Sequence, residues 1–406
     1  MSTDPSTLAV RAGRRPDPAT GAVVEPICQS TTYAQASLGA HQGHTYSRAS
    51  NPTVSTLEEA LGALEGAGLP GVCFSTGMAA IAALVTALAR TGDHVLVSDV
   101  VYGGTVRLLR EVFESLGVAA TYADAGDPEA FASHITPHTR LVLIETPGNP
   151  TLRLADIGAI SAHARRRGVP LAVDATFLTP IFQKPLDLGA DIVVHSTTKY
   201  IEGHGTTLGG AVLSRDARWL DRLRLVRKTL GSIQSPFEAW LTLRGLSTLP
   251  LRMARHAASA FEIARRLEVH PSVARVIYPW LESFAQHDLA RRQQGSGGGI
   301  VSFELAGDSP EDSYAAGRRL LARLRLCTLA ENLGSVQTLI THPASMTHAD
   351  VPASQRERAG ITPGLIRLSV GLESVDDLIA DLWNALDIEG GSDDDRAEVR
   401  QFCAAH

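Results

Sequence analysis

Short apolar runs rich in Val, Ile and Leu alternate along the first half of the chain with longer stretches of helical periodicity. Such runs, bounded by turn residues, are typical of strands buried on both faces of a parallel sheet. Apolar residues at helical spacing between them predict the helices of βαβ units. The pattern therefore predicts an α/β fold built on a mostly parallel, doubly wound sheet. The expected strands lie at 72–74, 94–98, 141–144, 171–173, 192–194 and 211–213, and the expected helices between them at 53–66, 79–88, 106–116 and 157–167.

The second half of the chain has a different pattern. Helical periodicity fills 217–230, 236–249 and 252–267, and two expected strands, 300–304 and 365–369, flank a helix at 312–324. A last helix is expected at 375–386. The pattern predicts a smaller α+β domain that follows the sheet domain. We expect an N-terminal arm at 1–50, a large domain at 51–245, a small C-terminal domain at 246–388 and a flexible acidic tail at 389–406.

Composition narrows the class of protein. The 406 residues are 44% hydrophobic and 20% charged, with a formal net charge of -6, as in an ordinary globular protein and unlike a nucleic-acid-binding surface. The N-terminus lacks a signal peptide, and no apolar run approaches the ~18 residues of a membrane span, so we expect a cytoplasmic protein. The four cysteines are scattered without a CxxC pair, and His342 and His348 lack a third ligand, so no metal site is expected.

Two of the expected strands end in residues that are candidates for catalysis or cofactor binding. The run at 171–173 ends in Asp174, and the run at 192–194 leads through Ser196 and Thr198 to Lys199. Because the carboxyl ends of parallel strands meet at one edge of a sheet, an acid and an amine should lie close together there. Pyridoxal phosphate needs an amine for its Schiff base, a carboxylate for its ring nitrogen, and hydroxyls and amides for its phosphate. Judged from these residues alone, an alternative interpretation stays open, in which Lys199 is an exposed lysine and Asp174 an ordinary aspartate at the end of a strand.

The segment from Asp174 to Lys199 resembles the cofactor signature of the cysteine and methionine metabolism family of pyridoxal-phosphate enzymes. This family includes cystathionine γ-synthase, cystathionine γ-lyase, methionine γ-lyase and the O-acylhomoserine sulfhydrylases, and the likeness runs from about Leu8 to Leu386. The resemblance implies the aspartate-aminotransferase-like fold, known as fold type I, with pyridoxal 5'-phosphate bound to Lys199. It also implies a homotetramer, a dimer of dimers with shared active sites.

The resemblance assigns further cofactor contacts. In the stretch YSRASNPT, Tyr46 and Arg48 would bind the phosphate of a neighbouring subunit's cofactor, and Arg suits this task because its fork matches phosphate oxygens. Tyr102 would stack on the cofactor ring and take part in proton transfer. The expected phosphate and ring contacts are completed by Gly77 and Met78 at a helix start, Asn149 in the PGNP turn, Asp174, Ser196 and Thr198.

The resemblance also suggests how substrate binds. Arg367, in the stretch LIRLSVGLE, would pair with the substrate α-carboxylate, while Arg107 and the loop beginning Glu331-Asn332 would face its distal part. The loop departs from the family pattern at Asn332, Ser335 and Gln337. Arg107 and Glu331 favour γ-elimination or γ-replacement on four-carbon amino acids of sulfur metabolism, as in cystathionine γ-lyase or γ-synthase. The alternatives are a methionine γ-lyase, an O-acylhomoserine sulfhydrylase, for which Thr206-Thr207 before two glycines is suggestive, and a cofactor-binding regulator without catalysis.

Overall fold

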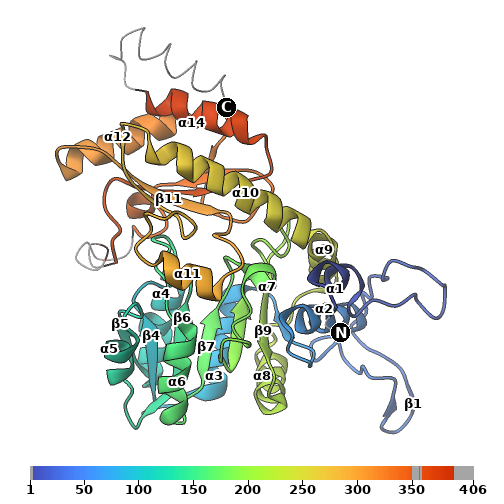
Figure 1. The fold of residues 1–406 in the computed structure, drawn as a ribbon. Coiled ribbons are helices and arrows are strands. Elements are labelled where there is room, and N and C mark those ends of the chain that lie inside the picture. Colours follow the sequence, from blue (N-terminus) through green and yellow to red (C-terminus); the bar gives the residue numbers. More distant parts are fainter. Residues whose placement is uncertain (1–2, 350–355, 357–358, 388–406) are drawn as a thin grey trace.

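The fold is described from a computed structural model, which describes residues 3–349, 356 and 359–387 (Figure 1). The expected acidic tail at 389–406 and Cys403 lie outside these residues. Cys28, Cys73 and Cys327 are free thiols. Within the described part of the chain, no helix has the length and apolar character needed to cross a membrane.

A seven-stranded sheet forms the larger part of the molecule, in the order β3-β9-β8-β7-β6-β4-β5. The four pairs from β8 to β5 are parallel, and β9 runs antiparallel to both β3 and β8. The expectation of a mostly parallel doubly wound sheet is confirmed. Its strands are β3 (Val72–Phe74), β4 (His94–Ser98), β5 (Ala119–Ala123), β6 (Thr139–Glu145), β7 (Leu171–Asp174), β8 (Ile192–His195) and β9 (Gly210–Ser214).

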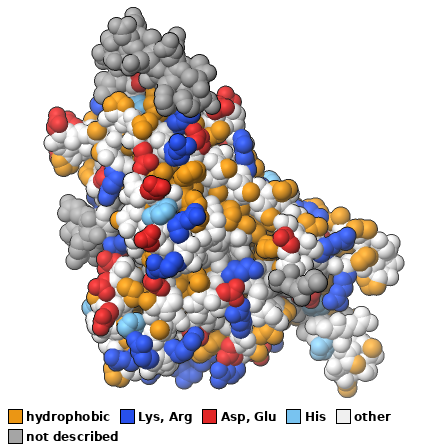
Figure 2. Space-filling model, viewed as in Figure 1, with side chains coloured by type: hydrophobic (Ala, Val, Ile, Leu, Met, Phe, Trp, Pro, Cys, Tyr) orange, Lys and Arg blue, Asp and Glu red, His pale blue; other side chains and the backbone are white. Residues whose placement is uncertain are grey.

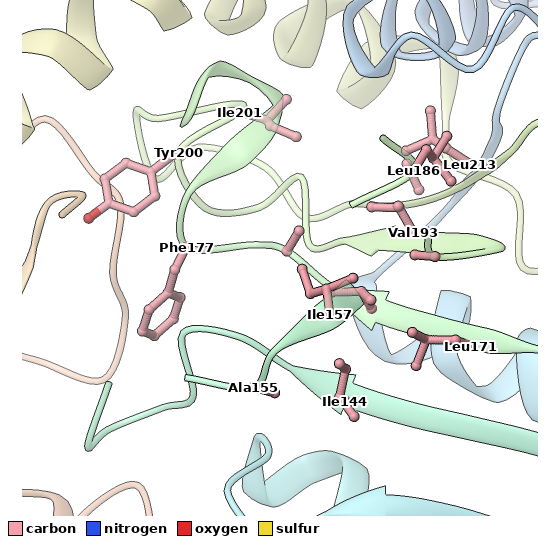
Figure 3. Packing of buried hydrophobic residues seen from close by; sticks show 14 of the residues in the cluster. Ile144, Ala155, Ile157, Leu171, Phe177, Leu186, Val193, Tyr200, Ile201 and Leu213 are labelled. Atoms are coloured by element: carbon pink, nitrogen blue, oxygen red, sulfur yellow. The ribbon is translucent and has the colours of Figure 1, made fainter. Parts of the chain in front are cut away.

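Helices cover both faces of this sheet, which explains the continuous apolar runs. Alternate strand residues point to opposite faces, so Val173 and Val193 join one hydrophobic cluster while Ala172 and Val194 join the other. Figure 3 shows the first cluster, with Ile144, Leu171, Val193 and Leu213 along neighbouring strands. The surrounding helices are α2 (Pro52–Glu65), α3 (Gly77–Leu88), α4 (Gly103–Leu108), α5 (Pro128–Ser133), α6 (Ile157–Arg166), α7 (Thr179–Phe182), α8 (Ala217–Leu230) and α9 (Pro236–Leu246).

A five-stranded sheet, in the order β10-β11-β14-β13-β12, forms the second lobe. All its pairs are antiparallel except β12 with β13. The long helix α10 runs diagonally across the upper lobe toward α9 in Figure 1. The lobe contains α10 (Leu249–Glu268), β10 (Val273–Ile277), α11 (His287–Gln293), β11 (Ile300–Leu305), α12 (Pro310–Arg323), β12 (Thr328–Leu329), β13 (Leu339–Thr341), β14 (Leu365–Ser369) and α14 (Val375–Leu386). The boundaries expected near residues 50 and 245 stay predictions.

The segment expected to form the N-terminal arm begins with a short helix that the sequence analysis did not predict. Residues Pro5–Arg11 form α1, whose Ala9 is buried in the core that also contains α2. Asp4 caps this helix by accepting a hydrogen bond from Ser6 N–H at 2.7 Å, and Pro5 follows at its first position. Beyond α1 the arm runs largely exposed through β1 (Gln35–Ser37) and β2 (Ala40–His41), and it projects away from the sheet in Figure 1.

The expected helix at 106–116 also needs correction. The helix begins at Gly103, inside the GlyGly stretch expected to be a loop, and it changes to a π-helix at Leu109–Phe113 and a 3-10 turn at Glu114–Leu116. Of the two glycines, Gly104 lies against the Tyr102 ring: a Cβ added there would meet the ring's Cε1 at 2.5 Å. Acidic and basic side chains are interspersed over the face of the molecule shown in Figure 2.

Candidate active site

A cavity of about 540 Å³ opens where the parallel strands of the large sheet end. Its walls come from the turn before α3, from the segments after β4, β6, β7 and β8, and from β14 and the loop before β13. The lining includes twelve of the fourteen expected site residues: Gly77, Met78, Tyr102, Arg107, Asn149, Asp174, Ser196, Thr198, Lys199, Glu331, Asn332 and Arg367. Residues far apart in the sequence thus meet in one space.

A larger hollow of about 620 Å³ lies elsewhere, beside β10. Two arginines in its lining are already paired, Arg275 with Glu304 at 2.9 Å and Arg153 with Asp99 at 2.6 Å. Size therefore does not identify the reactive site, and we assign it to the cavity that contains the lysine and the strand-end carboxylates.

Lys199 lies in the cavity with its side chain largely buried. Its Nζ donates a hydrogen bond to Asn332 Oδ1 at 2.5 Å. Burial, together with the nearby Arg367 cation, lowers the pKa of Lys199 to about 8. A lysine in this state supplies a neutral amine far more readily than an exposed one.

Asp174 ends β7 and is buried at the base of the cavity. Its Oδ1 accepts hydrogen bonds from Thr176 N–H at 3.0 Å and from Thr176 Oγ1 at 2.5 Å. Thr176 Oγ1 in turn accepts Ser196 N–H at 2.9 Å, which ties the ends of β7 and β8 together. Burial raises the pKa of Asp174, while the bonds from Thr176 act against that rise. Because both bonds end on Oδ1, Oδ2 keeps its accepting capacity.

The start of α3 forms an anion cradle. The Thr76 side chain caps the helix by accepting Ala79 N–H at 2.9 Å, and Ala80 N–H makes the first intrahelical bond, to the Thr76 carbonyl. The N–H groups of Gly77 and Met78 precede these bonds and lie at the positive end of the helix dipole. A Cβ added at Gly77 would meet Ser196 Oγ at 3.0 Å, so glycine lets this backbone approach the Ser196 hydroxyl. Thr198 Oγ1 is engaged with Gly209, whose N–H it accepts at 2.9 Å.

Arg367 reaches the cavity from β14 of the small sheet. Its Nη1 donates to Asn149 Oδ1 at 2.8 Å and its Nη2 donates to the Asn332 carbonyl at 3.0 Å. Its Nε is buried and has no hydrogen-bond partner among the described residues. Burial lowers the pKa of Arg367 to about 10, although the guanidinium remains a cation at neutral pH. The buried guanidinium thus keeps one N–H donor that no described residue uses.

Tyr46 and Arg48 are the two expected contacts that the structure does not bring into this cavity. Arg48 Nη1 donates to the Lys228 carbonyl at 2.5 Å, and its guanidinium lies 5.3 Å from the centre of the Tyr46 ring. Tyr46 is 43% exposed. Arg48 thus contacts the end of α8, and Tyr46 lies beside it.

Comparison with known proteins places this arrangement in a family. The profile of the "Cys/Met metabolism PLP-dependent enzyme" family matches residues 6–387. The chain belongs to this family. It is therefore a pyridoxal-phosphate-dependent enzyme with an amino-acid substrate, as the sequence predicted.

Relatives of this enzyme have several activities. It is 44% identical over 382 residues to a cystathionine β-lyase of Coxiella burnetii, covering 94% of this chain and 97% of that one. It is 45% identical over 387 residues to a cystathionine γ-synthase of Mycobacterium tuberculosis, covering 94% and 96%. A solved cystathionine γ-synthase from Xanthomonas oryzae, in complex with aminoacrylate and cysteine, matches with a TM-score of 0.89 at 44% identity, covering 95% of this chain and 98% of that one. This likeness confirms fold type I.

The residues of the cavity fit pyridoxal phosphate. An amine with a lowered pKa, a buried carboxylate with one free oxygen, and helix amides beside a hydroxyl are the three partners that this cofactor requires. Gly77 lies close to Ser196, and both line the cavity. In the described part of the chain, no group of three or more His, Cys, Asp or Glu is placed to hold a metal ion.

The sequence analysis missed three parts of this enzyme's cavity. Glu145, which precedes the turn that contains Asn149, lies in the cavity lining and is not among the expected site residues. Thr176, two residues after Asp174, bridges two strand ends. A hydroxyl residue just after an expected strand could have been used to predict this role. Met346 and Thr347, which lie between His342 and His348, also line the cavity and are not among the expected site residues.

Proposed function

We propose that this enzyme makes or breaks the bond between sulfur and the γ carbon of cystathionine, by γ-replacement or γ-elimination. The observation that carries the proposal is the pairing of charges in the cavity. Arg367 supplies a site for one carboxylate, and Arg107 and Glu331 line the same space as a further cation and anion. A substrate with an amino-acid group at each end matches this set, because its distal carboxylate and ammonium need one cation and one anion.

The reactive end is arranged to act on the α carbon. When bound, pyridoxal phosphate supplies a cationic ring that withdraws electrons from the substrate's α carbon. Arg367 would bind the substrate α-carboxylate through its unpartnered Nε and a neighbouring N–H of Nη2, fixing which bond of the α carbon faces Lys199. Lys199, as a neutral amine, would remove the α proton and return protons at later steps.

The remaining residues would bind and orient. Asp174 Oδ2 would accept a hydrogen bond from the protonated ring nitrogen and so keep the ring cationic, Asn149 would contact the phenolic oxygen, and Tyr102 would pack on the ring. Gly77, Met78, Ser196 and Thr198 would surround the phosphate. Asn332 Oδ1 accepts a hydrogen bond from Lys199 Nζ at 2.5 Å, which would help to hold the amine in the cavity.

We further propose that the enzyme is a homotetramer in which Tyr46 and Arg48 complete the phosphate site of a neighbouring subunit. Their position outside their own cavity supports this, together with the exposed arm that carries them. Arg227, which is buried, holds the arm at this point by donating to the Ala49 carbonyl at 3.0 Å. A catalytically competent monomer in analytical ultracentrifugation would contradict the shared site.

The test compares substrates and a matched pair of variants. Purified enzyme is given cystathionine, methionine or an O-acylhomoserine, each with and without cysteine, and 2-oxobutanoate and thioether are measured. Loss of one charge-assisted contact in Arg107→Met or Glu331→Gln should raise KM for cystathionine about 10- to 100-fold. The same variants should leave KM for methionine within about threefold, because its methyl group makes no ionic contact.

The outcomes separate the candidate reactions. Keto acid from cystathionine without thiol indicates γ-elimination, and thioether from the ester with cysteine indicates γ-replacement. Methionine turned over faster than cystathionine, with Arg107→Met unchanged on both, would overturn the proposal in favour of methionine γ-lyase.

A further inference from the structure

Glu145 is a buried carboxylate whose two oxygens are both used by backbone N–H groups. It ends β6 and is 7% exposed. Its Oε2 accepts Tyr102 N–H at 2.7 Å and its Oε1 accepts Asn149 N–H at 3.0 Å. Tyr102 follows β4 and Asn149 follows β6, so one side chain links the segments after two neighbouring strands.

The link continues into the small sheet. The Asn149 side chain accepts a hydrogen bond from Arg367 Nη1 at 2.8 Å. Glu145 is therefore joined to Tyr102 directly and to Arg367 through one intermediate residue. Two groups assigned above to opposite tasks, one to the ring and one to the substrate carboxylate, share this support.

Holding a carboxylate here is costly. Glu145 lies opposite Asp174 in the ladder of β6 and β7. Burial raises the pKa of Glu145, the Asp174 carboxylate raises it further, and the bonds from Tyr102 and Asn149 and the Arg367 cation act against that rise. A glutamine would be easier to bury, but its amide nitrogen would point at one of the two N–H donors. The geometry thus requires two acceptors on one side chain, which a carboxylate provides.

We propose that Glu145 is a positioning residue that sets the Tyr102 ring and the Asn149–Arg367 pair relative to each other through their backbone and side-chain bonds. It touches neither ring nor substrate in this role. The inference rests on the proposed function for the tasks of Tyr102 and Arg367, whereas the hydrogen bonds that carry it stand without that function.

The first test uses the unmodified holoenzyme. Tyr102 is 45% exposed and its N–H precedes the bonded turns of α4, so protection of this amide from hydrogen exchange reports its bond to Glu145. We expect the Tyr102 amide to exchange at least about 100-fold more slowly than an unstructured peptide, in residue-resolved mass spectrometry. Exchange within about threefold of the unstructured rate would overturn the proposal, whatever the substrate proves to be.

The second test uses Glu145→Gln with Asp381→Asn as its control. Asp381 also accepts backbone N–H groups, including those of Leu326 and Cys327, and it lies on α14 away from the cavity. We expect Glu145→Gln to keep its full cofactor content, to change the visible circular dichroism of the bound cofactor, to lose about tenfold or more in kcat and to raise KM about fivefold. Asp381→Asn should stay within about twofold of the original enzyme in kcat and KM.

The two variants distinguish positioning from general stability. Equal losses in both, or a Glu145→Gln enzyme with unchanged dichroism and kinetics, would contradict the proposal. If Glu145→Gln does not fold, the exchange measurement on the unmodified enzyme decides. Failure of cystathionine as a substrate would remove the proposed function alone, because protection of the Tyr102 amide and the dichroism do not depend on the substrate.

Discussion

The two ends of the cavity are built from different kinds of structure. At the cofactor end, Glu145 and Asp174 are the last residues of adjacent strands, and Lys199 follows the next strand after a short turn. At the distal end, Arg107 lies on α4, and Glu331 lies in the segment between β12 and β13. The first end is fixed by a hydrogen-bonded ladder, and the second depends on a short helix and a loop.

We infer from this difference that the cofactor end carries the shared chemistry and the distal end carries the variable specificity. Register in a parallel ladder cannot slip by one residue without turning every side chain to the other face, so the reactive groups are held by the whole sheet. Loops can change without that penalty. Accordingly, relatives named as a β-lyase, a γ-lyase and a γ-synthase are 44%, 43% and 45% identical to this chain, so overall identity does not select among their reactions.

The largest effect should come from Lys199→Ala, which removes the amine at the sheet end. We expect turnover to fall by about 10³-fold or more, because this group would serve as both cofactor attachment and base. The visible absorption that the cofactor shows when bound to the lysine should be lost at the same time. Lys184→Ala, a partly exposed lysine outside the cavity, is the control. Activity and absorption that both survive in Lys199→Ala would show that the amine lies elsewhere.

The next effect concerns stability and pH. Burial holds the folded-state pKa of Lys199 near 8, below its ordinary value of 10.5. Below pH 8 both folded and unfolded chains carry the proton, so the full cost of the buried charge, on the order of 3 kcal/mol, destabilises the fold. Between pH 8 and 10.5 only the unfolded chain keeps the proton, so this cost disappears as pH rises.

The measurement is urea unfolding of cofactor-free protein at pH 7 and pH 10. Lys199→Met should be more stable than the original chain at pH 7, by on the order of 3 kcal/mol, and the gap should nearly close by pH 10. Lys184→Met should show no such convergence. A gap between the original chain and Lys199→Met that is the same at both pH values would mean that the lysine is not desolvated.

How much of the site could be predicted from the sequence also differs between the two ends of the cavity. Asp174 and Lys199 could be placed at one sheet edge because strand ends are visible as the limits of apolar runs. Glu145 has the same signal, an acid directly after an apolar run, but the following Pro-Gly-Asn-Pro stretch drew attention to the turn. Its role depends on Tyr102, 43 residues earlier, and such a contact leaves no mark in a local pattern.

Two segments, α1 in the arm and the start of α4 on the distal side, were not predicted from local sequence patterns. The stretch from Asp4 carries a cap and a proline typical of a helix start, but its short length and polar setting concealed α1, which is stabilised by packing on α2. Gly103 and Gly104 are helical, although two adjacent glycines are typical of a loop, and Gly104 leaves the space that the neighbouring Tyr102 ring occupies. Tertiary packing overrode propensity at α1.

The smallest effect should come from Asn332→Ser, which changes the loop without touching the sheet. Serine has a shorter side chain, which cannot accept the hydrogen bond that Lys199 Nζ now donates to Asn332 Oδ1 at 2.5 Å. The bond from Arg367 Nη2 is unaffected because it ends on the backbone carbonyl of Asn332. We therefore expect kcat to change by about two- to fivefold while KM stays within about twofold, measured by steady-state kinetics. A rise in KM with unchanged kcat would contradict this prediction. It would show that Asn332 affects substrate binding through Arg367, and that the distal loop is coupled to the cofactor end of the cavity.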